Sequence, residues 1–187
     1  MSTREKLLAT ALSVFSERGT DGGSMREIAR RAGVNVATAY HHFGSKRALF
    51  LAIFRELGFL DAPIDVAASS FEGLTPRQRL EAIFVGAWAF MGTGADVVRL
   101  MVLEATKGDD EARAVFREWR RQGDDYIERV LVRAGLAQAT NVHQRAWLVR
   151  QTIWGTFVEA LMYGTLDAEE LRDKARTAAE ALTSGVW

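Results

Sequence analysis

The fold of this chain is decided by residues 24 to 46, which read Ser24-Met-Arg-Glu-Ile-Ala-Arg-Arg-Ala-Gly-Val-Asn-Val-Ala-Thr-Ala-Tyr-His-His-Phe-Gly-Ser-Lys46. Ser24 followed by Glu27 is typical of a helix start, because the two side chains can satisfy each other's exposed backbone N–H groups. Apolar residues then recur at helical spacing at Met25, Ile28, Ala29 and Ala32. The pattern predicts a helix over residues 25 to 32.

The next three residues, Gly33-Val34-Asn35, predict a turn. A Gly after a short helix, one apolar residue and an N-capping Asn are typical of a turn that joins two helices at a steep angle. The small side chains of Ala29 and Ala32 allow the second helix, expected over residues 36 to 42, to approach closely. The stretch therefore predicts a helix-turn-helix.

The second helix has few apolar residues to spare for a core, since only Ala39 and Phe43 are expected to face inward. Its other side presents Val36, Ala37, Thr38, Tyr40, His41 and His42. Such a face suits a DNA major groove about 12 Å wide, where small apolar groups touch thymine methyls and polar groups reach phosphates or base edges. The alternative is that a short helix of mixed polarity is ordinary surface.

Outward from this stretch, helical periodicity extends over the whole chain and predicts an all-α fold. Capping boxes at Ser2 with Glu5 and at Thr75 with Gln78, and N-caps at Asn141 and Asp167, mark helix starts. Stops are expected at Gly19, Gly33, Gly108 and Gly135. About nine helices follow, over residues 3–18, 25–32, 36–42, 46–60, 76–91, 97–107, 110–134, 142–164 and 168–184. The segment around Pro63 and Ser69-Ser70 is the expected junction between two domains.

Residues 15 to 54, and above all residues 24 to 46, resemble the DNA-binding domain of the TetR family of transcriptional repressors. The hydroxyl before the second helix, the Ile-Ala, the Ala-Gly-Val, the Tyr-x-x-Phe and the Ser-Lys occur in register. Asn35 departs from the Ser or Thr that the family most often has there, although Asn caps a helix equally well. The resemblance implies a DNA-binding domain over residues 1–50 and a helical effector-binding and dimerisation domain over residues 51–187.

The resemblance also implies roles for individual side chains. Ser24 and Lys46 would grip phosphates at the starts of helices, Tyr40 and His42 would contact backbone or bases, and Arg26 and Arg47 would add phosphate contacts. The expected DNA-binding residues are Ser24, Arg26, Asn35, Val36, Ala37, Thr38, Tyr40, His41, His42, Lys46 and Arg47.

The last two helices carry apolar stripes, which by the resemblance pair with their copies to form a four-helix bundle. One stripe holds Leu171, Ala175, Ala178 and Leu182, and the other holds Trp147, Gln151, Trp154, Val158 and Leu161. The expected partner is a second copy of the chain, with both copies on a palindromic double-stranded operator. The alternative is that the stripes pack only within one subunit.

The helices after the DNA-binding domain are rich in large apolar residues, which fit either an ordinary core or a cavity for an apolar small-molecule effector. The candidate pocket residues are Trp88, Met91, Met101, Glu104, Trp119, Tyr126, Trp154 and Glu159. A ligand there would tilt the helix that begins at Lys46.

Composition excludes other classes of protein. The 187 residues include no Cys, so a disulfide scaffold or a thiolate site is excluded. The longest uncharged run, residues 82–95, is shorter than the roughly 20 residues of a membrane span, and the polar start predicts a cytoplasmic protein without a signal peptide. The formal net charge is zero, but residues 1–55 are basic and the remainder is acidic, as expected of a small polyanion-binding module on a different body.

Two rival classes remain to be weighed. Against an enzyme, His41 and His42 are adjacent and form no i, i+4 metal pair, and the Gly19–Ser24 loop lacks the Lys of a phosphate loop; no catalysis, cofactor or metal is expected. The other rival is a helical ligand-binding or adaptor protein without DNA binding, although no core requires Thr38, Tyr40 and Lys46. The sequence names no effector, operator or regulated gene, and it leaves activation open beside repression.

Overall fold

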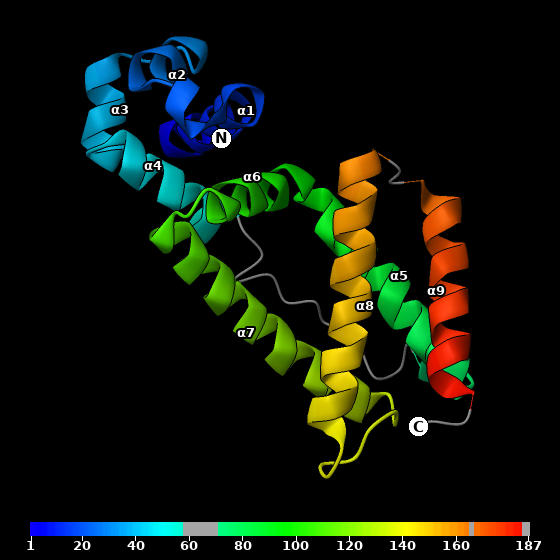
Figure 1. Ribbon diagram of the computed structural model, residues 1–187. Helices are drawn as coiled ribbons and strands as arrows, with labels where there is room; N and C mark the ends of the chain where they lie inside the picture. Colours follow the sequence, from blue (N-terminus) through cyan, green and yellow to red (C-terminus); the bar gives the residue numbers. More distant parts are fainter. Residues whose placement is uncertain (58–70, 165–166, 185–187) are drawn as a thin grey trace. The chain divides into compact units, whose positions relative to one another are not determined.

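The computed structural model describes residues 1–57, 71–164 and 167–184, and every regular element in these ranges is helical (Figure 1). The elements are α1 (Thr3–Gly22), α2 (Met25–Arg31), α3 (Val36–Phe43), α4 (Lys46–Ala52), the π-helical turn η1 (Ile53–Leu57), α5 (Pro76–Thr93), α6 (Ala95–Thr106), α7 (Asp110–Arg133), α8 (Val142–Tyr163) and α9 (Ala168–Thr183). The predicted all-α fold with nine α-helices is confirmed for this part of the chain. The predicted junction around Pro63 and Ser69-Ser70 lies outside the described residues.

Two of the three predicted capping boxes form in full. The Ser2 hydroxyl accepts from the Glu5 N–H at 3.2 Å while the Glu5 carboxylate accepts from the Ser2 N–H at 2.8 Å, and Thr75 and Gln78 pair in the same way. At Ser24 only the hydroxyl half forms, because the carboxylate of Glu27 is occupied by arginines of the same helix. The reciprocal box predicted there is wrong in that half.

One other predicted cap needs correction. The predicted N-cap Asn141 precedes α8, but its side chain makes no capping bond, because its Oδ1 accepts from the Gln138 N–H at 3.0 Å. The predicted stop at Gly19 is present as a break in α1: its backbone is non-helical, with φ of 69° and ψ of 168°, and a short helical segment follows as far as Gly22. Asp167 caps α9 as predicted, accepting from the N–H groups of Glu169 and Glu170.

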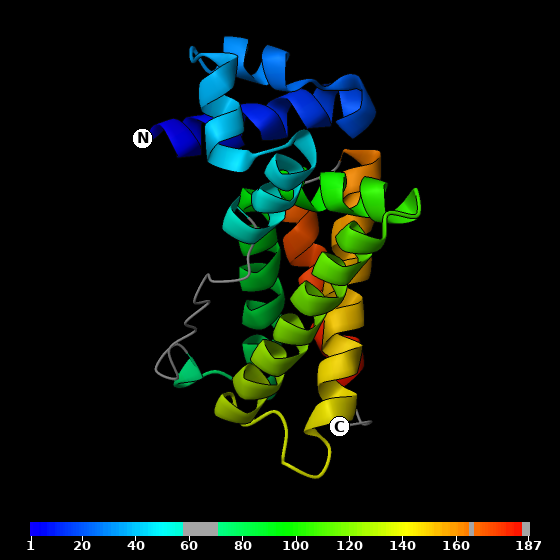
Figure 2. The same cartoon turned by 90° about the vertical axis from the view of Figure 1, so that its left-hand side faces the viewer.

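The described residues form two compact units, and the first contains α1 to α4, η1, α6 and α7 up to Trp119. In this unit α1 packs against α2, α4, η1 and α6, and Figure 2 shows α1, α2 and α3 gathered together. Its centre is a row of fully buried aromatic rings: Phe50 lies edge-on to Phe15 at 6.2 Å and to Phe54 at 4.8 Å between ring centroids. The sequence assigns α6 and α7 to the other domain, and its boundary at residue 50 stays a prediction.

The second unit contains α5, α7 from Arg120 onward, α8 and α9. α5 packs most extensively against α9, where Ala175 and Ala179 are completely buried and allow the close approach. Trp88 joins α5 to α8: its ring stacks on Phe84 and its Nε1 donates to the Ile153 carbonyl at 2.9 Å. A buried indole N–H that is hydrogen-bonded in this way belongs to a satisfied core.

Close packing at Gly23 makes a stability prediction. A Cβ at Gly23 would lie 2.8 Å from two Phe15 ring atoms, although the φ of −85° suits any residue. We expect Gly23→Ala to lower the free energy of unfolding by about 1–3 kcal/mol through overpacking.

The matched control is Gly86→Ala in α5, where an added Cβ meets no atom within 4 Å. This change is expected to raise stability by about 0.5–1 kcal/mol, because Ala restricts the unfolded chain and favours a helix. Urea unfolding of both variants checks the pair, and a Gly23→Ala protein as stable as the parent would contradict the packing of α1 against this loop.

Candidate nucleic-acid interface

The turn between α2 and α3 is built from the backbone upward. The Val34 N–H donates to the Ala29 carbonyl at 3.0 Å and the Gly33 N–H donates to the Arg30 carbonyl at 3.2 Å, which is the Schellman ending of a helix. Gly33 supplies the left-handed conformation that this ending needs, with φ of 70°. Asn35 then caps α3, its Oδ1 accepting from the Ala37 N–H at 2.9 Å. The predicted turn and cap are confirmed.

α3 buries two side chains and leaves the rest open. Ala39 and Phe43 are buried, as predicted. The side of the helix that they leave uncovered carries the six predicted groove-facing residues: Tyr40, Ala37 and His41 are exposed, and Val36, Thr38 and His42 are half-buried. Tyr40 keeps 49% of its surface exposed, which is a high fraction for a large aromatic side chain. The helix is therefore available to a partner.

Arg4 binds the C-terminal end of α3, a contact that the sequence pattern does not predict. Its Nη1 donates to the His42 carbonyl at 3.2 Å, and its guanidinium carbon lies 4.4 Å from the centre of the Phe43 ring. Its Nε donates to the Glu56 carboxylate of η1 at 2.9 Å. A cation at a helix C-terminus is favourable because the last carbonyls carry partial negative charge. Partners 38 and 52 residues away leave no local signal in the sequence.

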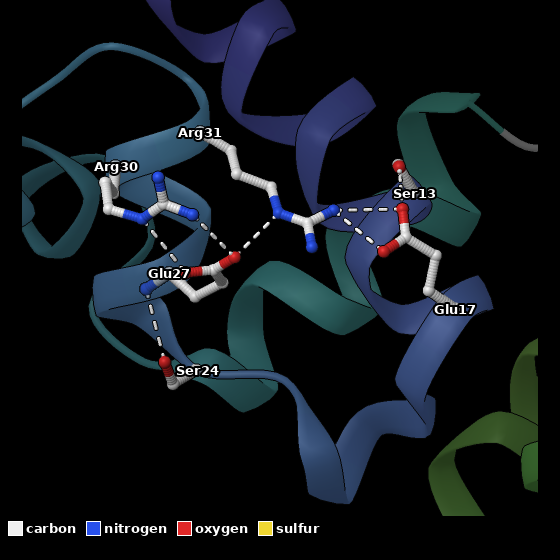
Figure 3. Close-up of polar contacts among 6 residues, drawn as sticks. All are labelled: Ser13, Glu17, Ser24, Glu27, Arg30 and Arg31. Carbon is white, nitrogen blue, oxygen red and sulfur yellow. Dashed lines mark hydrogen bonds and ion pairs between the residues drawn. The ribbon is translucent and has the colours of Figure 1, made fainter.

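An ion network joins α1 to α2 beside Ser24 (Figure 3). The Glu27 carboxylate accepts from the Nε of Arg30 at 3.1 Å and from the Nε of Arg31 at 2.7 Å. Arg31 also reaches Glu17 of α1 at 2.8 Å. Hydrogen bonds from Arg30 and then from Arg31 lower the pKa of Glu27 to about 2. Both arginines are therefore neutralised internally, whereas the exposed Arg26 on the same helix takes no part in this network.

Lys46 lies where α4 begins, next to the capping hydroxyl of Ser45. Its Nζ donates to the Thr20 carbonyl at 2.8 Å and to the Gly23 carbonyl at 3.1 Å, so two of its three protons tie α4 to the end of α1. This brings the start of α4 next to the start of α2 at Ser24. The predicted phosphate contact of Lys46 stays a prediction beside this positioning role.

Arg47 is engaged by acids. It forms ion pairs with Asp109 and Glu111 around the start of α7, and the Arg47 guanidinium lowers the pKa of the Asp109 carboxyl. The contact of Arg47 with a phosphate also stays a prediction, since the side chain would first have to leave these carboxylates.

The candidate pocket residues do not all lie in one unit. Met101, Glu104 and Trp119 belong to the first unit, and Trp88, Met91, Tyr126, Trp154 and Glu159 belong to the second. Glu104 is buried and accepts from the Lys107 ammonium at 2.8 Å, while Glu159 is exposed beside Lys174. The effector pocket therefore stays a prediction. In the described ranges no three His, Asp or Glu side chains gather as metal ligands.

The N-terminal part of the chain is similar in sequence to known transcriptional regulators. Residues 7–53 match the family model described as bacterial regulatory proteins, tetR family. The HTH-type transcriptional regulator BetI of Rhizobium meliloti (strain 1021) is 43% identical over 81 residues, which cover 43% of this chain and 39% of that protein. The HTH-type transcriptional repressor BepR of Brucella suis biovar 1 (strain 1330) is 35% identical over 91 residues, 49% of this chain and 44% of that protein. The chain thus matches about two-fifths of the length of these curated relatives.

Solved structures share the fold over nearly the whole chain. The transcriptional regulator FadR from Bacillus subtilis, in complex with stearoyl-CoA, has a TM-score of 0.73 at 19% identity and covers 98% of this chain and 99% of its own. A transcriptional regulator from Rhodococcus sp. Rha1 has a TM-score of 0.73 at 24% identity, with 98% and 97% covered. Residues 7–53, the part of the chain that runs from α1 to α4, therefore carry the helix-turn-helix of the family described as bacterial regulatory proteins, tetR family.

Proposed function

We propose that this chain is a transcriptional regulator that binds a palindromic DNA operator as a homodimer and is released by a small apolar molecule. The observation that carries the proposal is α3, which follows a helix-turn-helix turn, buries only Ala39 and Phe43, and exposes Tyr40. Repression is the proposed sign of regulation, supported by the relative named as a repressor. In the described residues no single helix has the length and apolar composition of a membrane span.

Sequence readout by one α3 is modest. α3 contains no Arg or Lys, so the strong bidentate contact of a cation with guanine is absent from it. Recognition then falls to Tyr40, His41 and His42, to methyl contacts of Ala37, and to DNA shape. Two copies of α3 add their binding energies, which favours a dimer on half-sites about 34–36 Å apart.

Two surfaces of the second unit support a dimer. On α8, Trp147 keeps 51% of its surface exposed and Met162 keeps 76%, which is a large apolar area for an isolated chain. On α9, the outer members of the predicted stripe, Leu171, Ala178 and Leu182, are only half-buried in the single chain. A second copy packed against both helices would cover these groups.

The effector is proposed to be apolar and to bind within the helical second unit. Half-buried Tyr126 and Trp154 in this unit are adaptable neighbours for such a ligand, and the stearoyl-CoA of the B. subtilis structure supports a long apolar ligand by analogy. To lower operator affinity, the effector must bind better to the conformation that does not hold DNA. A coupling of about 1–3 kcal/mol corresponds to roughly 5-fold to 150-fold in affinity.

The direct test of the proposed function is selection of bound sequences from random duplex DNA. We expect the parent chain to recover a palindrome and Tyr40→Ala to recover a blurred motif, because Tyr40 is the largest exposed side chain of α3. Recovery of unpatterned DNA by both proteins would contradict the proposal and favour a ligand-binding or adaptor protein.

The internal ion network predicts which α2 arginine faces phosphate. Arg26→Gln is expected to reduce the slope of log affinity against log salt by about 0.9 for each subunit, since one phosphate contact is lost. Arg30→Gln is the matched control on the same helix, and it should change the slope much less because Glu27 already neutralises Arg30. Titration of a duplex at several salt concentrations measures both; a larger change for Arg30→Gln would refute this assignment.

The proposed interface makes a third prediction. Trp147→Glu should weaken self-association about tenfold or more, because removing a large aromatic anchor and adding a charge costs about 1.4 kcal/mol or more. Leu103→Glu in α6, an exposed apolar residue of the other unit, is the control and should leave association unchanged. Sedimentation equilibrium decides the matter, and a parent chain that stays monomeric would rule out the dimer.

A further inference from the structure

Each nitrogen of the Arg47 guanidinium donates a hydrogen bond to a carboxylate. Its Nη2 donates to Oδ1 of Asp109 at 2.5 Å and its Nη1 reaches the other Asp109 oxygen, so this contact is bidentate. Its Nε donates to Oε2 of Glu111 at 2.5 Å. All three guanidinium nitrogens thus face oxygens of the turn between α6 and the first residues of α7.

Arg47 lies in the first turn of α4, directly after Lys46. The Lys46 ammonium binds the Gly23 carbonyl, which immediately precedes Ser24 at the start of α2. Ser24 and Lys46, at the starts of α2 and α4, are the residues for which the resemblance implies phosphate contacts. Arg47 is therefore adjacent to the proposed phosphate contacts while its charge is used elsewhere.

A carboxylate and a phosphate present the same planar pair of oxygens to a guanidinium. We propose that Asp109 and Glu111 are internal competitors for Arg47, which hold this side chain away from the DNA backbone so that the turn between α6 and α7 sets the affinity for DNA. This inference rests on the proposed function, because it requires that DNA binds at α2 to α4.

The exposure of Arg47 and Glu111 allows Arg47 to exchange a carboxylate partner for a phosphate. The side chains of Arg47 and Glu111 are 42% and 59% exposed, so water and salt screen their attraction. Asp109 is the fixed member, since its Oδ1 also caps α7 by accepting from the Ala112 N–H at 2.7 Å. An Asp carboxylate is already ionised at neutral pH, and the hydrogen bond from Arg47 lowers the pKa of Asp109 further.

The position of α7 consequently controls Arg47. With both acids in place the three groups carry a net charge of −1, which repels a phosphate. A displacement of the first turn of α7 would remove Asp109 and Glu111 together, and Arg47 would be free to contact the backbone. The contacts of Arg47 with Asp109 and Glu111 thus link the conformation of the first turn of α7 to the number of cations available to DNA phosphates.

The test uses the full chain and a random-sequence 30-base-pair duplex, because a phosphate contact requires no operator. Asp109→Asn and Glu111→Gln are combined; Asn keeps the helix cap and Gln keeps the side-chain size, so both changes remove only charge. We expect the double variant to bind about 3-fold to 10-fold more tightly at low salt. We also expect its slope of log affinity against log salt to steepen by about 0.9 for each subunit, which corresponds to one added phosphate contact.

Asp110→Asn is the matched control, since Asp110 lies between the two acids but pairs with Arg113 and is 93% exposed. It reports the gain from weaker general repulsion. The second control places the double change in an Arg47→Gln background. There the proposal predicts no gain in affinity beyond about twice that of Asp110→Asn on a logarithmic scale, because two negative charges are removed instead of one.

The possible outcomes distinguish a failure of the inference about Arg47 from a failure of the proposed DNA binding. Weaker binding by the double variant, or a gain without Arg47 that exceeds the gain from weaker general repulsion, would overturn the inference and leave DNA binding intact. Glu111→Gln alone, which removes no helix cap, gives the same answer if the double variant is unstable, with a smaller expected gain of about twofold. A parent chain that binds no duplex at all would overturn the proposed function and the inference with it.

Discussion

α3 depends on its two ends, because its middle contributes little to its own stability. A helix of eight residues is far below the length at which isolated helices persist in water. Only Ala39 and Phe43 are buried, so the apolar contribution is small. The Schellman turn at Gly33 and the Asn35 cap fix the start of the helix, and Arg4 fixes its end. This arrangement leaves the remaining side chains of α3 for a partner.

Several cations of the N-terminal unit are likewise used for contacts inside the molecule. The sequence shows a surplus of cations in residues 1–55, and the structure shows that several of them are engaged by acids. Arg4 pairs with Glu56, Arg31 pairs with Glu17 and Glu27, and Arg47 pairs with Asp109 and Glu111. Except for Arg31 with Glu27, which lie in the same helix, these pairs join different elements. The count of basic residues therefore overstates the positive charge that is available to a partner, and under the proposed function that charge comes from cations such as Arg26.

The sequence predicts features that depend on neighbouring residues. The turn at Gly33, the Asn35 cap and the inward pair Ala39 and Phe43 follow from local spacing, and the structure confirms them. The order of nine α-helices also follows from local spacing, and the structure confirms it in the described ranges 1–57, 71–164 and 167–184. The half-formed box at Ser24 differs from the prediction because other groups compete for the Glu27 carboxylate, which two arginines draw away from the cap.

Long-range contacts lie beyond such reasoning. The bonds of Arg4 to His42, of Lys46 to Thr20 and of Arg47 to Asp109 span 38, 26 and 62 residues, and no periodicity encodes them. The predicted pocket is a second case of this kind. Large apolar side chains show the same sequence pattern whether they fill a core or line a cavity, so the sequence does not distinguish the two. Trp88 belongs to a hydrogen-bonded core contact, which its sequence position alone does not distinguish from a ligand wall.

The central claim is that α3 is the surface that meets DNA, and photo-crosslinking tests it most directly. Tyr40 and Tyr163 are both exposed tyrosines, one on α3 and one at the end of α8. Each is replaced in turn by a benzophenone-bearing phenylalanine, and the protein is irradiated with duplex DNA. The account predicts DNA adducts from position 40 and none above background from position 163. Adducts from position 163 without adducts from position 40 would contradict it.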